Sequence, residues 1–272
     1  MTIQLGCHIW TFPQCTVAEA AGIIRALGLT HMDLGNARDF DPTYIAANIV
    51  EEAARLNQIK AQTGVTFVDA FPHLPPSFST NHPDPAVRAE HRAQMAAFLD
   101  FAVEIGLSGV TFSPGRYWSD QAPASDFERG AVELRHMVVE GSRRGLFIRI
   151  EPHIESVTWN PDLTLQMLAA VPGLSLTLDY SHFIFHAIPA DHIAPLAPHA
   201  THWHARQACP GQGQSSFAQG TIDFAEIVHG LHARGYAGVI CLEYVHGDWM
   251  QMDRVDCLSE TVLLRDELRR WL

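Results

Sequence analysis

The segment FIRIEPH, residues 147–153, contains a short apolar run that closes on an acidic residue. A similar run, closing on an acidic residue or a histidine, returns three times further along the chain, in LSLTLDYSH (174–182), THWHAR (201–206) and VICLEYVH (239–246). Each run has the length of a buried strand, and a carboxylate or an imidazole stands where the strand should end. The stretch between successive runs is long enough for a crossover helix, which predicts parallel strands.

Apolar runs of this kind recur along the whole chain. Their approximate bounds are 3–9, 31–34, 65–71, 109–113, 147–151, 174–179, 201–204 and 239–243. Helical stretches such as 16–27, 41–62 and 84–105 lie between them, each beginning at Thr or Asp, which are typical N-caps. Glycines suited to left-handed helix ends precede several strands, namely Gly28, Gly64, Gly106, Gly145 and Gly235. No linker divides the chain, so the sequence predicts one α/β domain over residues 1–272, a single (β/α)8 TIM barrel.

The main alternative is a doubly wound open sheet. Folds of that kind usually carry a glycine-rich phosphate loop after the first strand. Here CHIWTFPQCT (7–16) stands at that point, and neither a GxGxxG nor a GxxxxGK[ST] motif occurs in the chain. The barrel is therefore the favoured interpretation.

Composition excludes several classes of partner and location. The chain has 18 basic and 30 acidic residues, a formal charge of −12 that would repel nucleic acid. The five cysteines show no CxxC spacing, so no disulfide framework or zinc ribbon is indicated. No stretch is apolar enough to span a bilayer, and the N-terminus does not read as a secretion signal. We therefore expect a cytoplasmic protein with neither a membrane nor a nucleic-acid partner.

Four polar residues close the last four apolar runs: Glu151, Asp179, His204 and Glu243. The carboxyl ends of barrel strands meet around one rim, so these side chains should converge. Three carboxylates cannot be packed together unless a cation neutralises them, which predicts one bound divalent metal ion. A carboxylate-rich set with one nitrogen ligand suits Mn²⁺, Mg²⁺ or Co²⁺, and Zn²⁺ is less favoured. Alternatively, each carboxylate caps a helix or pairs with a nearby arginine.

Other strand ends supply candidates for binding a substrate. His182 and His153 follow the acidic residues of their strands closely. Arg206 follows His204 by two residues, so the side chains of His204 and Arg206 should point the same way. Three further candidates for the same pocket are His8, His73 and Arg116. Trp10, Phe71 and Trp118 could form an apolar wall. His202 is expected to point away from the mouth, into the layer between barrel and helices.

The motifs IEPH, LDYSHF, HWHAR and CLEY, in this order and at about this spacing, resemble those of the xylose isomerase-like (β/α)-barrel superfamily. The resemblance spans almost the whole chain. It implies that the four ligands bind Mn²⁺ or a similar ion, that Glu151 and Glu243 also shuttle protons, and that His182 contacts a substrate oxygen. Ketohexose 3-epimerases of this superfamily carry a glutamate and an arginine where this chain has Val157 and Pro210, a departure for which Glu155 and Arg206 could substitute.

These observations favour a metal-dependent isomerase or epimerase of a sugar or polyol-derived substrate. In this hypothesis the metal polarises a carbonyl, and a glutamate moves the proton of the neighbouring C–H through an enediolate. A metal-dependent dehydratase or lyase acting on a keto-sugar, keto-inositol or dehydroshikimate-like compound is the first alternative. A non-catalytic sugar-binding barrel, or a subunit of a larger enzyme, is the second.

The segment 205–220 is a long loop after the histidine strand. Its composition suggests flexibility, and it could fold over the mouth as a lid. It could equally form a contact in a homo-oligomer.

Overall fold

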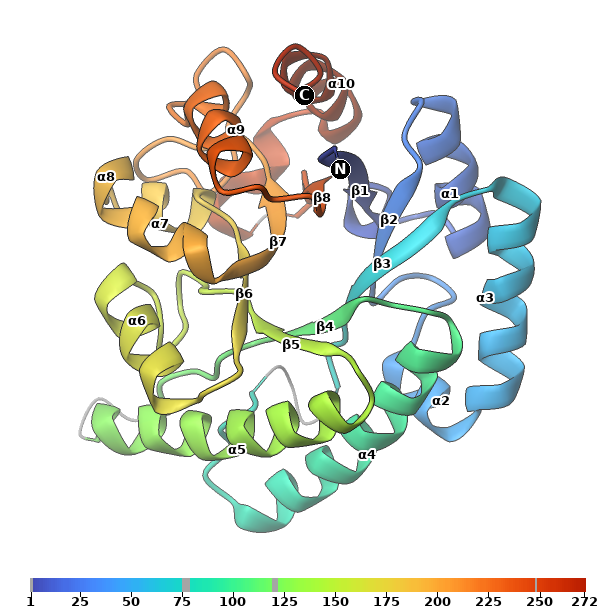
Figure 1. The fold of residues 1–272 in the computed structure, drawn as a ribbon, viewed down its shortest axis with the longest axis vertical. Helices are drawn as coiled ribbons and strands as arrows, with labels where there is room; N and C mark the ends of the chain where they lie inside the picture. Colours follow the sequence, from blue (N-terminus) through green and yellow to red (C-terminus); the bar gives the residue numbers. More distant parts are fainter. Residues whose placement is uncertain (1, 75–78, 119–121, 248) are drawn as a thin grey trace.

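Parallel strands form the wall of a barrel, and helices surround it (Figure 1). The computed structural model describes residues 2–74, 79–118, 122–247 and 249–272. The strands are β1 (Gln4–His8), β2 (His31–Gly35), β3 (Thr66–Phe71), β4 (Gly109–Phe112), β5 (Phe147–Ile150), β6 (Ser175–Leu178), β7 (Ala200–Ala205) and β8 (Val239–Leu242). Each lies within two residues of its predicted position, so the predicted (β/α)8 barrel is confirmed.

The strands pair in the order β3-β2-β1-β8-β7-β6-β5-β4, all in parallel. The ring closes between β3 and β4, where the backbone N–H of Ser108 donates to the carbonyl of Val68 at 2.9 Å. Because all strands run the same way, their carboxyl ends share one rim of the barrel. That rim holds the candidate site.

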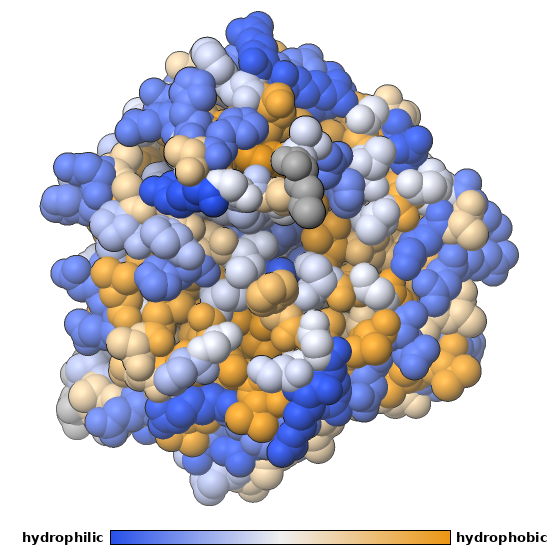
Figure 2. Space-filling view, viewed as in Figure 1, coloured by the Kyte–Doolittle hydropathy of each residue, from blue (hydrophilic) through white to orange (hydrophobic). Residues whose placement is uncertain are grey.

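The outer layer consists of helices that follow the strands. They are α1 (Val17–Ala26), α2 (Pro42–Ala47), α3 (Ile49–Thr63), α4 (Pro85–Glu104), α5 (Pro123–Arg143), α6 (Pro161–Ala170), α7 (Ser181–Phe185), α8 (Ala190–Ile193), α9 (Phe224–Ala233) and α10 (Cys257–Leu268), with 3-10 turns at Ile9–Thr11, Ala194–His199 and Trp249–Arg254. None of the described helices combines the length and apolar character needed to cross a bilayer. Figure 2 shows hydrophilic residues around the edge of one face and apolar residues nearer its middle.

Local sequence signals explain where helices begin and end. Thr16 and Glu19 form a capping box at the start of α1, and Asp84 caps α4 as predicted. All five glycines expected to end helices have positive φ, for example 69° at Gly64. The single helix predicted over 41–62 is instead two helices, because Asn48 leaves the helical region and donates its side-chain N–H to the carbonyl of Tyr44.

The interior of the barrel contains a buried ion pair in addition to its apolar core. Arg149 on β5 and Asp69 on β3 lie 3.0 Å apart, and both are about 1% exposed. The Nε–H of Arg149 donates to Thr201 Oγ1, and Thr111 donates to the Asp69 carboxylate. These bonds satisfy the buried charges and link β3, β4, β5 and β7 across the barrel.

Candidate metal and active site

The four predicted ligands all lie at the carboxyl-end rim and are buried. Glu151, Asp179 and Glu243 directly follow β5, β6 and β8, and His204 is the last residue but one of β7. Each of the four residues is no more than 2% exposed. The four residues therefore lie at the ends of four successive strands, as the sequence predicts.

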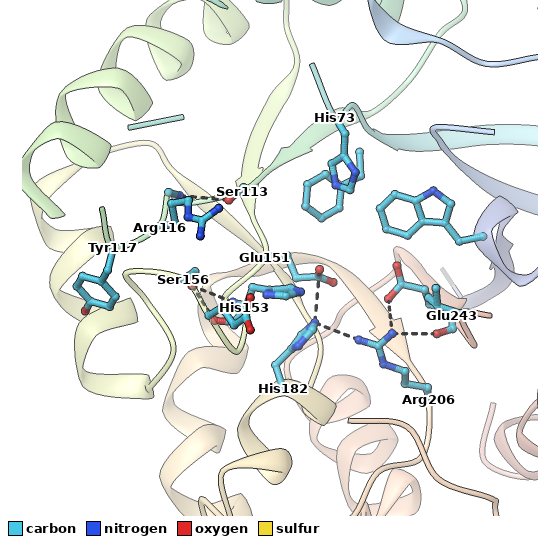
Figure 3. Close-up of a pocket in the computed structure, with 15 residues that line it drawn as sticks. His73, Ser113, Arg116, Tyr117, Glu151, His153, Ser156, His182, Arg206 and Glu243 are labelled. Atoms are coloured by element: carbon cyan, nitrogen blue, oxygen red, sulfur yellow. Dashed lines mark hydrogen bonds and ion pairs between the residues drawn. The ribbon is translucent and has the colours of Figure 1, made fainter. Parts of the chain in front are cut away.

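An imidazole nitrogen connects two of the three acids. Nδ1 of His204 lies 2.7 Å from Oε1 of Glu151 and 3.3 Å from Oε2 of Glu243. The two glutamates, from opposite sides of β7, thus face one nitrogen atom. Figure 3 shows their carboxylates pointing into the same space.

The third acid, Asp179, already has cationic and hydrogen-bonded partners. Its Oδ2 lies 3.0 Å from Nη2 of Arg206 and accepts the Ser181 hydroxyl, and its Oδ1 accepts the Ser181 backbone N–H. Nη1 of Arg206 lies 3.5 Å from Oε2 of Glu243. The alternative in which a strand-end acid pairs with an arginine therefore describes Asp179, while Glu151 contacts no arginine among the described residues.

Arg206 also fixes the tautomer of His182. Nη2 of Arg206 lies 3.1 Å from Nε2 of His182, and a guanidinium can only donate. Nε2 of His182 is therefore an acceptor, and its proton is on Nδ1. Nε2 also lies 3.6 Å from Oε2 of Glu151 (Figure 3).

The local charges fit a divalent cation. Burial opposes protonation of His204, but the carboxylates of Glu243, Glu151 and Asp33 outweigh it and raise the His204 pKa well above its usual value. Even with His204 protonated, it and Arg206 balance only two of the three rim carboxylates. Both carboxylate oxygens of Glu243 lack a hydrogen bond among the described residues. Buried unpartnered oxygens are costly in an apolar site, and a metal ion would satisfy them.

The sequence analysis did not place one residue of this buried cluster, Asp33 on β2. It is 1% exposed, and its Oδ2 lies 2.6 Å from Nε2 of His202 and 3.3 Å from Nε2 of His204. The available signal was a carboxylate inside the apolar run HMDLG (31–35). The prediction that His202 points away from the site was wrong, because side chains two residues apart on a strand share a face, and His202, His204 and Arg206 all point inward.

A cavity of about 700 Å³ opens over these groups. The rings of Trp10 and Phe71 lie together in its lining, and Tyr117 lies apart from them, beyond Arg116 (Figure 3). The polar lining includes the predicted residues His73, Arg116, His153, His182 and Arg206 together with Glu151 and Glu243. His8 and Trp118 are not among the lining residues. His8 lies against His204, with ring centroids 5.5 Å apart, and its Nδ1 accepts the Trp10 backbone N–H at 3.1 Å. The indole N–H of Trp118 donates to Asn81.

The departures from the ketohexose epimerase pattern can be located in the structure. Val157 is fully buried and Pro210 is exposed, and neither lines the cavity. Glu155 and Arg206, the expected substitutes, both line it. A glutamate and an arginine thus line the cavity, although neither stands at the position that the ketohexose 3-epimerase pattern gives it.

The segment 205–220, for which the sequence left a lid and an oligomer contact equally open, packs against the body of the chain. None of its residues from 207 to 220 lines the cavity. Gln214 is buried, and its amide accepts the Val245 N–H at 2.7 Å and donates to the carbonyls of Val245 and Met252 at 3.0 and 2.9 Å. The loop therefore supports the segment that follows Glu243 and does not cover the mouth.

The model of one protein family, described as the xylose isomerase-like TIM barrel, matches residues 20–271. The chain belongs to this family. No protein of curated function matches it in sequence. Among solved structures, this xylose isomerase-like barrel is similar in fold to an L-ribulose 3-epimerase, with a TM-score of 0.76 and 17% identity over 100% of this chain and 95% of the other.

Two further structures show the same likeness. A D-allulose 3-epimerase from Methylomonas sp., in complex with D-allulose, has a TM-score of 0.74 and 16% identity over 100% of this chain and 98% of the other. A 3-keto-D-glucoside 4-epimerase from E. coli has a TM-score of 0.71 and 16% identity over 96% and 99% of the two chains. At these identities the likeness establishes the shared fold.

Proposed function

We propose that this xylose isomerase-like barrel is a divalent-metal-dependent isomerase or epimerase of a sugar or polyol-derived substrate. The observation that carries the proposal is the pair Glu151 and Glu243, which line one cavity and face the same imidazole nitrogen at 2.7 and 3.3 Å. Two carboxylates on one cavity can remove and return a proton at carbon. The sugar epimerases among the structural neighbours support the substrate class.

The residues that would hold the ion are Glu151, Asp179, His204 and Glu243. When bound, a divalent cation such as Mn²⁺ would polarise the substrate carbonyl and acidify the adjacent C–H. The oxygen-rich donor set with one imidazole favours Mn²⁺, Mg²⁺ or Co²⁺ over Zn²⁺. Metal analysis of the protein purified without chelator, followed by reconstitution with each ion, tests this choice.

Glu151 and Glu243 would transfer the proton of the carbon next to the carbonyl. Neither carboxylate oxygen of Glu243 accepts a hydrogen bond from the described residues, so its carboxylate is the better placed to accept a proton, while Glu151 is hydrogen-bonded to His204. Return of the proton to the opposite face of the same carbon gives an epimer, and return to the adjacent carbon gives an isomer. Both outcomes use the same two groups.

The remaining groups would bind and orient the sugar. Arg206 can donate to a substrate oxygen and place positive charge beside a developing enediolate. His182 offers an N–H on Nδ1, which has no partner in the described chain. Trp10 and Phe71, with ring centroids 5.5 Å apart, supply an apolar surface for a sugar face. His73, His153 and Arg116 complete the polar lining, whereas His8 lies outside it, against His204.

The test is incubation of the purified protein with Mn²⁺ and a panel of keto-sugars in D₂O. Solvent deuterium retained in a product of otherwise unchanged composition supports isomerisation or epimerisation. Loss of water from the substrate would identify a lyase instead. No turnover with any metal, combined with normal ligand binding by Glu151→Gln and Glu243→Gln variants, would favour a non-catalytic sugar-binding barrel.

A further inference from the structure

Asp33 stands on the far side of His204 from the two glutamates. Nδ1 of His204 faces Glu151 and Glu243, while Nε2 faces Oδ2 of Asp33 at 3.3 Å. A second histidine, His202, lies 2.6 Å from the same Asp33 oxygen. All three residues are no more than 2% exposed, so water does not compete for these contacts.

The two ring nitrogens of His204 have different chemical roles. A neutral imidazole carries one proton, and the nitrogen without it offers the lone pair that binds a metal. In the structure Nδ1 hydrogen-bonds to Glu151 at 2.7 Å, and Nε2 makes no hydrogen bond among the described residues. Asp33, 3.3 Å from Nε2, is the carboxylate that would accept the Nε2 proton when a metal ion takes Nδ1. With the proton on Nε2, the lone pair would be on Nδ1, the atom that lies between Glu151 and Glu243.

His202 keeps Asp33 in place for this task. Its Nε2–H donates to Oδ2 of Asp33, and the two imidazoles stand edge to face with centroids 5.5 Å apart. Asp33 and His202 come from β2 and β7, which are not neighbours in the barrel wall. Their contact therefore crosses the barrel interior and fixes the carboxylate against rotation.

A separate metal ion bound by Asp33, His202 and His204 is the competing explanation, since their ligand atoms lie close enough together. That arrangement would use Nε2 of His204 as a ligand. A neutral ring cannot then also offer Nδ1 to the site beside Glu151 and Glu243. The unpartnered oxygens of Glu243 favour the ion on the Nδ1 side.

We propose that Asp33 is a positioning residue that sets the tautomer and ring orientation of His204 so that Nδ1 faces the metal. This inference rests on the proposed function only in requiring that the rim binds a divalent ion. Carboxylates that orient a ligand histidine typically contribute 10- to 100-fold to metal affinity. Asp33 would act through His204 and would touch neither ion nor substrate.

The test compares Asp33→Asn with Asp69→Asn, a matched control. Asp69 is also a buried strand carboxylate inside the barrel, but it pairs with Arg149. Equilibrium dialysis against Mn²⁺ is expected to show about 10- to 100-fold weaker binding for Asp33→Asn. The Asp69→Asn variant loses stability but is expected to bind Mn²⁺ as the wild type does. Equal Mn²⁺ affinity in wild type and Asp33→Asn would overturn the inference.

A second measurement needs no variant at Asp33 and so does not depend on its folding. In wild-type protein with ¹⁵N-labelled histidine and bound Zn²⁺, the His204 ring is expected to show a protonated Nε2 and a metal-bound Nδ1. The His204→Gln variant identifies the signal. A metal-bound Nε2 contradicts the inference while leaving the proposed function intact. Wild-type protein that binds no divalent ion contradicts both.

Discussion

Arg206 and Asp179 form a fully buried ion pair at the rim of the barrel, with Nη2 and Oδ2 3.0 Å apart. The same guanidinium lies 3.5 Å from Glu243, so one cation serves two of the proposed metal ligands. A cation at this position neutralises part of the charge that would otherwise drive the carboxylates apart. The site thus contains one fixed positive charge beside the place proposed for a divalent ion.

Arg206→Gln is expected to destabilise the metal-free protein by about 3–5 kcal/mol, because it leaves buried carboxylates without their cation. The loss should be smaller with Mn²⁺ present, since the ion supplies charge to the same acids. Urea unfolding with chelator and with excess Mn²⁺ measures both values. Arg206→Lys, which keeps the charge, is the control and should lose less. Equal losses of stability with and without Mn²⁺ would show that Arg206 and the ion do not neutralise the same carboxylates.

Glu151→Gln and Glu243→Gln are each expected to lower kcat by about 10²- to 10⁴-fold, the usual contribution of a general acid or base. Neither amide can accept the substrate proton. Turnover and deuterium uptake from D₂O should fall together, measured with the substrate that the panel identifies. Glu104→Gln, at an exposed glutamate at the end of α4, is the control. Retention of full activity by either rim variant would remove that glutamate from the mechanism.

Gln214→Leu is expected to destabilise the protein by about 1–3 kcal/mol, since it leaves buried backbone groups of Val245 and Met252 unbonded. Thermal or urea unfolding measures this loss. Gln219→Leu, on the exposed part of the same loop, should change stability by less than about 0.5 kcal/mol. A Gln214→Leu variant with unchanged stability and an altered KM would restore the interpretation of the loop as a lid.

His73 should make stability depend on pH. Burial, with help from the neighbouring His8, lowers its pKa from 6.5 to about 4 in the folded state. Between these values the unfolded chain binds a proton that the folded protein does not, so stability decreases as pH falls from 6.5 toward 4. The slope from this group approaches about 1.4 kcal/mol per pH unit. Urea unfolding in chelator should give a flatter profile for His73→Gln, and an identical profile would contradict the shift.

Much of the site followed from the strand pattern. Glu151, Asp179, His204 and Glu243 could be placed on one rim because parallel strands bring their carboxyl ends together and each of these residues ends an apolar run. The helix ends at Thr16 and Gly64 followed from short-range capping chemistry. These inferences need only neighbours in sequence and the direction of the strands.

The rest depends on contacts across the barrel. Periodicity places Arg206 on the inner face but does not give its rotamer, so its pairing with Asp179 could not be foreseen. Asp33 was missed because its partners, His202 and His204, lie on a strand far away in sequence. The strand period places His202 on the same inner face as His204. The prediction that His202 points outward was therefore wrong because the period was misapplied. The packed state of the loop after β7 depends on Gln214, whose partners lie beyond β8.

The most direct measurement is anomalous X-ray scattering at the manganese edge from crystals soaked in Mn²⁺. The account predicts one strong peak within ligand distance of Glu151, Glu243 and Nδ1 of His204, with Asp179 at its edge. Crystals that show no peak there, with Arg206 still bridging Asp179 and Glu243, would contradict it.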